Sequence, residues 1–160
     1  MKNSTTNLLF VCTGNICRSP MAEVLALAIA DQHSRFIESK SASVLGLENQ
    51  PAHPHAVRVL AEKGLDLSMH VAQPVTAELM SWADHVLCME FAHTAELRDR
   101  YPEHEERILL LGPFGGGMEI ADPLGGWRGR FRRSRDEIAA CIGHFIEQLP
   151  EAQPEPNLAP

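Results

Sequence analysis

The sequence predicts one α/β domain, a three-layer sandwich with a central four-stranded parallel sheet. Two observations lead to this class: short apolar runs alternate with segments of helical apolar spacing, and no internal repeat interrupts that alternation. Strands separated by helices predict parallel pairing with right-handed crossovers. The chain has 160 residues, of which 44% are hydrophobic, and this is enough to build one core.

The predicted elements follow one another from the N-terminus. Residues 7–12 form an apolar run typical of a buried strand, and residues 19–33 have helical spacing with Pro20 in the first turn. A second strand is expected over 35–43 and a second helix over 55–64. The remaining elements are, in order, a helix at 76–83, a strand at 84–89, a helix at 92–101, a strand at 107–111, a Gly-rich loop at 115–117 and a last helix at 134–149.

Charge and hydropathy exclude several classes of partner. The formal net charge of −7 gives no general attraction to nucleic acid or to anionic lipid, so neither is expected as a partner. No run approaches the roughly 18 apolar residues of a membrane span, and the first residues, MKNSTTN, contain no apolar signal segment. A cytoplasmic location without a membrane partner is therefore expected, and no feature of the sequence defines an oligomeric state.

The cysteines and histidines predict neither a disulfide framework nor a metal site. The four cysteines are Cys12, Cys17, Cys88 and Cys141. They are unevenly spaced, and no two of them form a Cys-x-x-Cys pair. His53 and His55 alternate in a Pro-rich stretch without a nearby cysteine or carboxylate, so they are not expected to bind a metal. No cofactor is predicted.

The segment VCTGNICRS, residues 11–19, has the features of an anion-binding loop between the first strand and the first helix. Unpaired backbone N–H groups and the helix dipole favour an anion there. Gly14 and Asn15 tolerate the unusual backbone angles of such a loop, and Arg18 adds a planar pair of donors that matches two oxygens of a phosphate. The predicted ligand is a tetrahedral oxyanion. The phosphate-binding residues are Thr13, Gly14, Asn15, Ile16, Cys17 and Arg18.

Cys12 is the candidate nucleophile of this loop. A helix N-terminus and a neighbouring arginine favour the thiolate form of a cysteine. A thiolate below a bound phosphoryl group can attack phosphorus in line, which gives a phosphocysteine that water then hydrolyses. Ser19 can hydrogen-bond the sulfur. The alternative is a buried core cysteine at the end of a strand, but Cys12, Arg18 and Ser19 together favour the nucleophile.

The segment VCTGNICRSPMAE resembles the active-site signature Cys-x5-Arg-Ser/Thr of the low-molecular-weight protein tyrosine phosphatases. The segments KSAS, GLDLSMHVAQPVT, ADHVLCME, RILLLG and ADPLGG follow in that family's order, so the resemblance covers residues 7–149 and implies a phosphatase domain over 1–149. It implies hydrolysis of protein phosphotyrosine and small aryl phosphates, with a phosphorylated protein as partner, such as a bacterial tyrosine kinase. Residues 150–160 contain four prolines and are expected to be a disordered tail.

The resemblance also implies roles for residues outside the loop. The family's general acid lies in an Asp-Pro loop, and only ADPLGG fits, so Asp122 is expected to protonate the leaving oxygen; a plain turn aspartate is the alternative. Asn15, Ser41 and His70 match a hydrogen-bond network that supports the loop, although His70 has the alternative of an ordinary histidine. Cys17 matches a cysteine that forms a reversible disulfide with the nucleophile, and an unreactive loop residue is its alternative.

The choice of substrate depends on the middle of the loop. CTGN, SPMAE, PHAV and VTAELM resemble the bacterial protein-arginine phosphatases, whose loop has threonine where this sequence has Ile16. An apolar side chain suits an aromatic phosphate ester, so phosphotyrosine is predicted and phosphoarginine is the alternative. Leu47 and Leu124 stand where many members have aromatic residues, and with Ile16 they are expected to form the substrate wall.

Three weaker alternatives concern function and specificity. Thioredoxin-coupled arsenate reductases share the fold and loop but need two further cysteines; Cys88 is one candidate, and residues 89–103 contain no second. A phosphate-binding module without turnover would use the same loop, but retention of Cys12, Arg18 and Asp122 favours an enzyme. The segment WRGRFRRSR, residues 127–135, either attracts acidic sequences near a phosphosite or is a solvated helix face, which the pattern favours.

Overall fold

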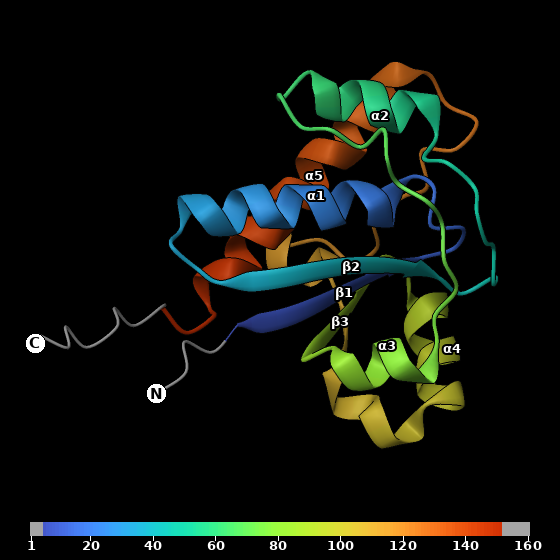
Figure 1. Cartoon of the computed structure of the whole chain (residues 1–160), viewed down its shortest axis with the longest axis vertical. Coiled ribbons are helices and arrows are strands. Elements are labelled where there is room, and N and C mark those ends of the chain that lie inside the picture. The colour runs from blue at the N-terminus through green and yellow to red at the C-terminus, as the bar shows by residue number, and fades with distance from the viewer. Residues whose placement is uncertain (1–4, 152–160) are drawn as a thin grey trace, which may run out of the picture.

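A parallel sheet of four strands forms the middle layer of the computed structural model, which describes residues 5–151 (Figure 1). The strands are β1 (Thr6–Cys12), β2 (Ile37–Ser43), β3 (His85–Cys88) and β4 (Ile108–Leu110). They lie in the order β2-β1-β3-β4, and all neighbouring pairs are parallel. The predicted α/β class with a four-stranded parallel sheet is therefore confirmed.

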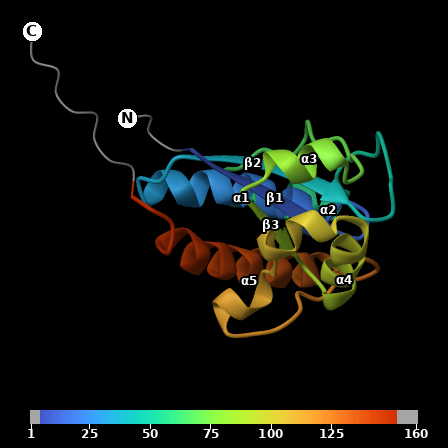
Figure 2. The same cartoon turned by 90° about the horizontal axis from the view of Figure 1, so that it is seen from below.

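Helices cover both faces of the sheet, as two perpendicular views show (Figures 1 and 2). The elements are α1 (Arg18–Gln32), α2 (Pro54–Ala61), α3 (Ala77–Trp82), α4 (Phe91–Arg100) and α5 (Arg128–Glu147), with the 3-10 helices η1 (Pro102–Arg107) and η2 (Gly112–Gly115). Helices α1, α2 and α5 lie on one face, whereas α3 and α4 lie on the other. The three layers of the predicted sandwich are thus present.

Strand β1 is buried on both of its faces. Leu8 and Phe10 pack into the core formed with α1 and α5, whereas Leu9 and Val11 pack into the core formed with α3 and α4. Successive side chains of a strand point to opposite faces, so a strand covered on both sides is apolar throughout. This is why residues 8–12 form a continuous apolar run with no alternation.

The carboxyl end of β1 is the point at which the chain changes direction within the sheet. Strand β2 lies on one side of β1 and β3 lies on the other, so the connections after β1 and after β2 run in opposite directions. In open α/β sheets the loops diverge at such a point, and ligands bind in the crevice that they leave. Cys12 is the last residue of β1 and therefore lies at the expected place for a ligand site.

The main departure from the sequence prediction concerns the last helix. Helix α5 begins at Arg128, whereas the apolar spacing predicted a start at residue 134. Among residues 128–133 only Phe131 is buried, so the arginines around it hide the helical period. Residues 152–160 of the predicted tail lie outside the described residues. Within the range 5–151, no helix is long and apolar enough to cross a bilayer.

Candidate active site

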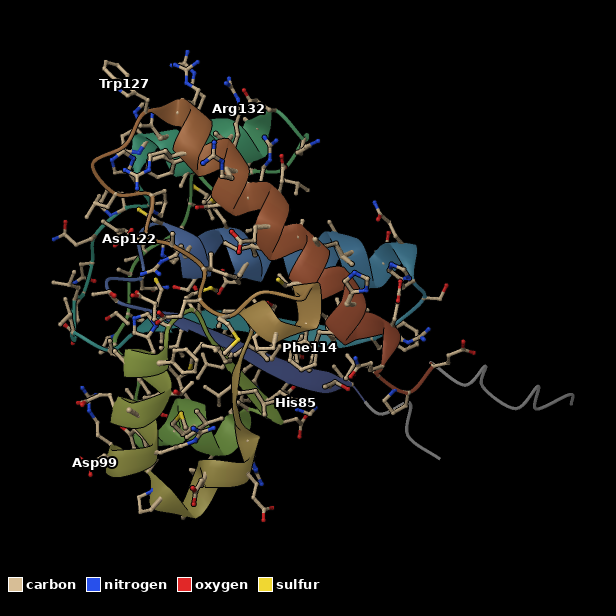
Figure 3. All side chains as sticks on the ribbon, turned by 180° about the vertical axis from the view of Figure 1, so that it is seen from behind. His85, Asp99, Phe114, Asp122, Trp127 and Arg132 are labelled. Carbon is tan, nitrogen blue, oxygen red and sulfur yellow. The ribbon has the colours of Figure 1, made fainter. Side chains whose placement is uncertain are left out.

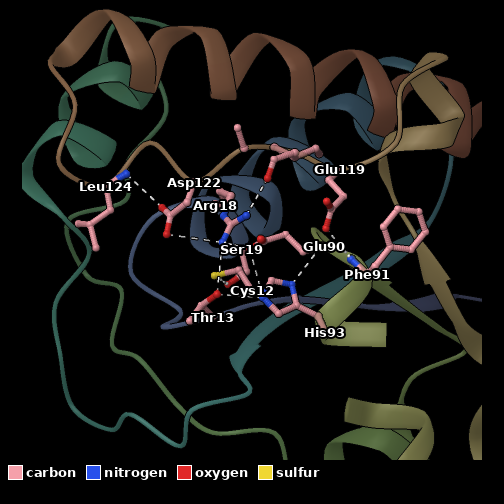
Figure 4. A network of polar contacts seen from close by, with 12 residues as sticks. Cys12, Thr13, Arg18, Ser19, Glu90, Phe91, His93, Glu119, Asp122 and Leu124 are labelled. Atoms are coloured by element: carbon pink, nitrogen blue, oxygen red, sulfur yellow. Dashed lines mark hydrogen bonds and ion pairs between the residues drawn. The ribbon is translucent and has the colours of Figure 1, made fainter. Parts of the chain in front are cut away.

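The loop between β1 and α1 wraps its polar groups around the sulfur of Cys12 (Figure 4). The Sγ atom of Cys12 lies 2.9 Å from Oγ of Ser19, and it accepts the backbone N–H of Asn15 at 3.3 Å. Asn15 has a φ of +57°, in the left-handed region that asparagine tolerates better than most residues. This backbone turn brings the amide toward the sulfur, so the loop stabilises negative charge on Cys12.

Asn15 is fixed by contacts from three other residues, one on α1 and two in the loop before α3. Its side-chain Nδ2 donates to Oγ of Ser19 at 2.8 Å, and its Oδ1 accepts the backbone N–H of Gln73 at 3.0 Å. Its carbonyl oxygen accepts a hydrogen bond from Nε2 of His70 at 2.8 Å. Because a carbonyl only accepts, Nε2 of His70 carries the proton. Burial lowers the pKa of His70, which favours the neutral ring in this role.

Ser41 reaches the loop through Gln73 and does not touch Asn15 directly. The Nε2 group of Gln73 donates to the carbonyl oxygen of Ser41 at 3.1 Å, while the Ser41 hydroxyl donates to Glu23 at 3.3 Å. Burial raises the pKa of Glu23. Gln73 thus joins Asn15 to Ser41, whereas His70 contacts Asn15 directly. The sequence analysis did not single out Gln73.

Arg18 is buried and held on two sides by groups from distant parts of the chain. Only 1% of Arg18 is exposed. Its Nη1 donates to the carbonyl oxygen of Ile120 at 2.7 Å, and its Nη2 lies 2.7 Å from Oε2 of Glu90. The same Nη2 lies 3.7 Å from Oδ2 of Asp122. A guanidinium held in this way is preorganised, so little conformational entropy is lost when an oxyanion binds it.

His93 orients Thr13 at the edge of the loop (Figure 4). The backbone N–H of Glu90 donates to Nδ1 of His93 at 3.1 Å, so Nδ1 carries no proton. Burial and the neighbouring Arg18 guanidinium lower the pKa of His93, and the ring is therefore neutral with its proton on Nε2. That Nε2 donates to Oγ1 of Thr13 at 2.9 Å. The Thr13 hydroxyl consequently has its own proton free for a ligand.

Asp122 stands at the entrance of the site, opposite Glu90 and Phe91 (Figure 4). Its Oδ1 accepts the backbone N–H of Leu124 at 3.0 Å, and its side chain is 43% exposed. The Asp122 loop is held near β3 because the N–H of Ile120 donates to the carbonyl oxygen of Met89 at 2.9 Å. A partly exposed carboxyl beside the buried Arg18 can exchange protons with a substrate and with water.

The three predicted wall residues differ in their surroundings. Ile16 is half-buried and packs against the core, and its carbonyl oxygen accepts the N–H of His53. Leu47 lies over the loop, since a Cβ added at Gly14 would stand 3.3 Å from Leu47 Cδ1. Leu124 is exposed on the Asp122 loop. Leu47 and Leu124 therefore belong to loops on the surface around the site, whereas Ile16 is anchored against the core.

The other cysteines are buried thiols, and the histidines of the Pro-rich stretch have structural contacts. Burial raises the pKa of Cys17 to about 12, while Cys88 is fully buried in the core and burial also raises its pKa. His53 caps α2 by accepting the N–H of His55, and it stacks on Phe131 at a centroid distance of 4.8 Å. No cluster of three or more metal-ligating side chains occurs among the described residues.

Glu90→Gln is expected to lower the free energy of unfolding by roughly 1–3 kcal/mol, because it leaves the buried Arg18 without its closest carboxylate. Inorganic phosphate should restore more stability to this variant than to the unmodified protein, since the anion replaces the lost charge. Thermal unfolding with and without phosphate measures both effects. Glu119→Gln is the matched control, because Glu119 accepts only the N–H of Phe91 among residues 5–151. Equal unfolding temperatures of Glu90→Gln and the unmodified protein would contradict this role.

The fold and the loop define a site for a tetrahedral oxyanion beside a cysteine sulfur, and comparisons with known proteins give the family. The family model of the low molecular weight phosphotyrosine protein phosphatases matches residues 7–155. The chain is 37% identical to a protein-arginine-phosphatase of Bacillus subtilis, over 89% of this chain and 96% of that protein. It is 40% identical to EpsP of Ralstonia nicotianae, a probable low molecular weight protein-tyrosine-phosphatase, over 89% of this chain and 94% of that protein.

A solved structure of the arginine phosphatase YwlE, in a variant with a phosphorylated active-site serine, superimposes with a TM-score of 0.85 at 35% identity. The match covers 89% of this chain and 95% of that chain. The chain described here therefore belongs to the low molecular weight phosphotyrosine protein phosphatase family. The predicted family and the predicted enzyme class, a phosphatase, are therefore confirmed.

Glu90, His93 and Gln73 complete the site but were not predicted from the sequence. One signal was available for the first two: Glu90 follows β3 almost directly, and the carboxyl ends of adjacent parallel strands meet at one edge of the sheet. The sequence MEFAH thus places a carboxylate and an imidazole beside the end of β1. Gln73 offered no comparable signal, because it lies in a segment without regular structure.

Proposed function

We propose that this chain hydrolyses phosphotyrosine in proteins, and small aryl phosphates, through a phosphocysteine intermediate. The observation that carries the proposal is the convergence at the end of β1. The sulfur of Cys12 lies among hydrogen-bond donors, and Arg18 beside it is oriented by groups from the far end of the chain. Asp122 stands at the mouth, 3.7 Å from the same guanidinium. A nucleophile, an oxyanion clamp and a proton donor are the three parts that phosphate ester hydrolysis requires.

In the first step, the phosphoryl group lies in the loop and Arg18 binds two of its oxygens. The Cys12 thiolate attacks phosphorus, the bond to the phenolic oxygen breaks, and Asp122 donates a proton to that leaving oxygen. In the second step, water attacks phosphorus while Asp122 accepts its proton, and the sulfur–phosphorus bond breaks. The Ser19 hydroxyl, 2.9 Å from the sulfur, stabilises the thiolate as it leaves. The phosphorylated active-site serine of the YwlE variant supports a covalent intermediate at this position of the fold.

We propose the catalytic domain to span residues 1–149 and the protein to act in the cytoplasm on a phosphorylated protein, for which a bacterial tyrosine kinase is a candidate. Cys17 is proposed as the redox partner of Cys12, since both are free and buried in the same loop. Peroxide would convert Cys12 to a sulfenic acid, and the Cys17 thiol would displace water from it to form a disulfide. Burial raises the pKa of Cys17 to about 12, so this thiol stays protonated and reacts poorly with peroxide. Cys12 is therefore the cysteine that is oxidised first.

Ile16→Thr tests the choice between phosphotyrosine and phosphoarginine. The curated relatives include phosphatases named for each substrate, so their names do not decide between the two. Ile16 is the loop residue on which the predicted difference in substrate depends. The unmodified protein is expected to hydrolyse a phosphotyrosine peptide faster than the matching phosphoarginine peptide, because isoleucine gives the aromatic ring an apolar neighbour. The Ile16→Thr variant should shift the ratio of the two kcat/KM values toward phosphoarginine by about tenfold or more.

The control is Val57→Thr, which makes a similar exchange at a half-buried position on α2 that belongs to the core rather than to the loop. It should leave the ratio unchanged. Faster hydrolysis of phosphoarginine by the unmodified protein would overturn the choice of phosphotyrosine and support the arginine phosphatase reading.

A further inference from the structure

We propose that the start of α5 forms a docking surface for acidic side chains that flank the phosphorylated residue of a protein substrate. This docking surface consists of Trp127, Arg128, Arg130 and Arg133. The proposal rests on the proposed phosphatase function, because it specifies which phosphorylated segments that function prefers. It follows from the position, the unpaired charge and the exposure of these four residues.

The docking surface begins directly after the loop that carries Asp122. The N–H of Gly126 donates to the carbonyl oxygen of Pro123 at 2.9 Å, which closes a tight turn with Gly125 at a φ of +83°. The stem of Arg130 packs against Gly126, so a Cβ added there would require the Arg130 side chain to move. The docking surface therefore directly continues the general acid's loop, and Figure 3 shows Trp127 beyond Asp122 at the end of the molecule.

The charge of this segment is only partly neutralised by its surroundings. Residues 127–135 contain five arginines and no acidic residue, in a chain whose net charge is −7. Two of these arginines, Arg132 and Arg135, share Glu62 at 2.7 and 2.9 Å. The other three, which belong to the docking surface, have no ion-pair partner among residues 5–151. Their positive potential is thus available to an anionic partner.

Two further features of the docking surface indicate a ligand rather than a merely solvated helix face. The Nε atom of Arg128 is buried and has no hydrogen-bond acceptor within the described part of the chain, although buried donors are nearly always satisfied. Trp127 is 87% exposed, the largest exposed fraction among the exposed large hydrophobic side chains. Tryptophan and arginine are the residues that most often dominate protein interfaces, so their combination here favours a protein partner.

The side of the site entrance that lies opposite Asp122 determines how a bound substrate segment is oriented. Glu90, Glu119 and Phe91 lie on that side, away from Asp122 and Leu124 (Figure 4). Glu90 is paired with Arg18, but Glu119 is exposed and accepts only a backbone N–H among the described residues. Acidic residues of a substrate are repelled by Glu119 and attracted by the arginines, so they should lie toward α5. An acidic segment of the phosphoprotein therefore fits the charge pattern of the mouth. Nucleic acid is the less favoured partner, because the surface is small and faces this acidic wall across the entrance of the site.

Peptide hydrolysis tests the proposal directly. One phosphotyrosine peptide carries Asp and Glu beside the phosphotyrosine, and a second carries Lys in the same places. The unmodified protein should give the higher kcat/KM on the acidic peptide, with a preference that falls as salt rises. Arg130→Glu combined with Arg133→Glu should lower kcat/KM on the acidic peptide by roughly three- to tenfold and leave p-nitrophenyl phosphate, which has no flanking residues, unaffected.

The control variant is Arg98→Glu combined with Arg107→Glu, which makes the same change in net charge near β4. It should retain the preference for the acidic peptide. The docking surface would be overturned by equal rates on the two peptides, or by the same loss of preference in both double variants. Hydrolysis of p-nitrophenyl phosphate would still support the phosphatase function in either case.

A binding measurement tests the docking surface independently of the phosphatase function. An unphosphorylated acidic peptide should change the fluorescence of Trp127 at low salt, and Trp127→Phe isolates that signal from Trp82, the second tryptophan. If the protein hydrolyses no phosphate ester but this change occurs and is lost on charge reversal, the docking surface stands and the phosphatase function fails. No fluorescence change, or tighter binding of a single-stranded oligonucleotide than of the acidic peptide, would argue against the proposed partner.

Discussion

Cys12→Ser is expected to abolish turnover of aryl phosphates, with a loss of roughly 10⁴-fold or more in kcat. The serine hydroxyl is a far weaker nucleophile than a thiolate, and within the described residues the groups around this position are donors that stabilise a negative charge rather than a base that would create one. The backbone amides and Arg18 remain in place, so inorganic phosphate should still protect the variant against thermal unfolding. Steady-state kinetics and thermal shift with phosphate measure the two effects.

Cys141→Ser is the matched control for this exchange. Cys141 is a buried thiol on α5, whose Sγ lies 3.7 Å from the carbonyl oxygen of Gly112, far from the loop in sequence. It should keep its activity. Full activity in Cys12→Ser would exclude the covalent mechanism, and loss of phosphate binding together with activity would mean that the sulfur itself holds the loop together.

Asp122→Asn is expected to slow hydrolysis of phosphotyrosine by roughly 10²- to 10⁴-fold, which is the usual contribution of a general acid. The amide keeps the hydrogen bond from the Leu124 N–H and the place beside Arg18, but it has no proton to donate to the leaving oxygen. The loss should be smaller for p-nitrophenyl phosphate, because p-nitrophenol leaves more easily without a proton. The ratio of the two losses, measured as kcat/KM, distinguishes proton transfer from a general disturbance of the loop.

Glu119→Gln again provides the control, since it removes a carboxylate from the same mouth without changing a contact to Arg18. In this variant kcat/KM should fall only slightly, and by the same factor for phosphotyrosine and for p-nitrophenyl phosphate. An Asp122→Asn variant that loses the same factor on both substrates would assign Asp122 a positional role, in which it only completes the surroundings of Arg18.

The fold was predictable because each layer leaves its own mark on the sequence. β1 appears as an uninterrupted apolar run from Leu8 to Cys12, and the alternation with helices then requires parallel strands. The start of α5 was not predictable in the same way. Its first turns bury only Phe131 before residue 134, so no apolar period distinguishes them from a solvated loop. Helix boundaries depend on local packing that hydrophobic spacing does not record.

The site was predictable where one short segment carries the chemistry. Cys12, Asn15 and Arg18 lie within seven residues, and the loop's geometry follows from a strand that runs into a helix N-terminus. Glu90 and His93 come from a different strand end, and their importance depends on the buried Arg18 guanidinium needing a counter-charge. That need becomes visible only when burial is known, because an arginine in a sequence gives no sign that solvent will be excluded from it.

The hydrogen bond from Arg18 to the carbonyl oxygen of Ile120 joins residues that are 102 positions apart. During synthesis, the loop of Cys12 therefore exists long before the segment that orients its arginine and supplies Asp122. A nascent or partly folded chain has the thiol but not the assembled site. The chain can therefore catalyse hydrolysis only after the last third of the sequence has been synthesised and has folded. Phosphatase activity in this protein is consequently a readout of completed folding, and a destabilising substitution near Ile120 should remove activity before it unfolds β1.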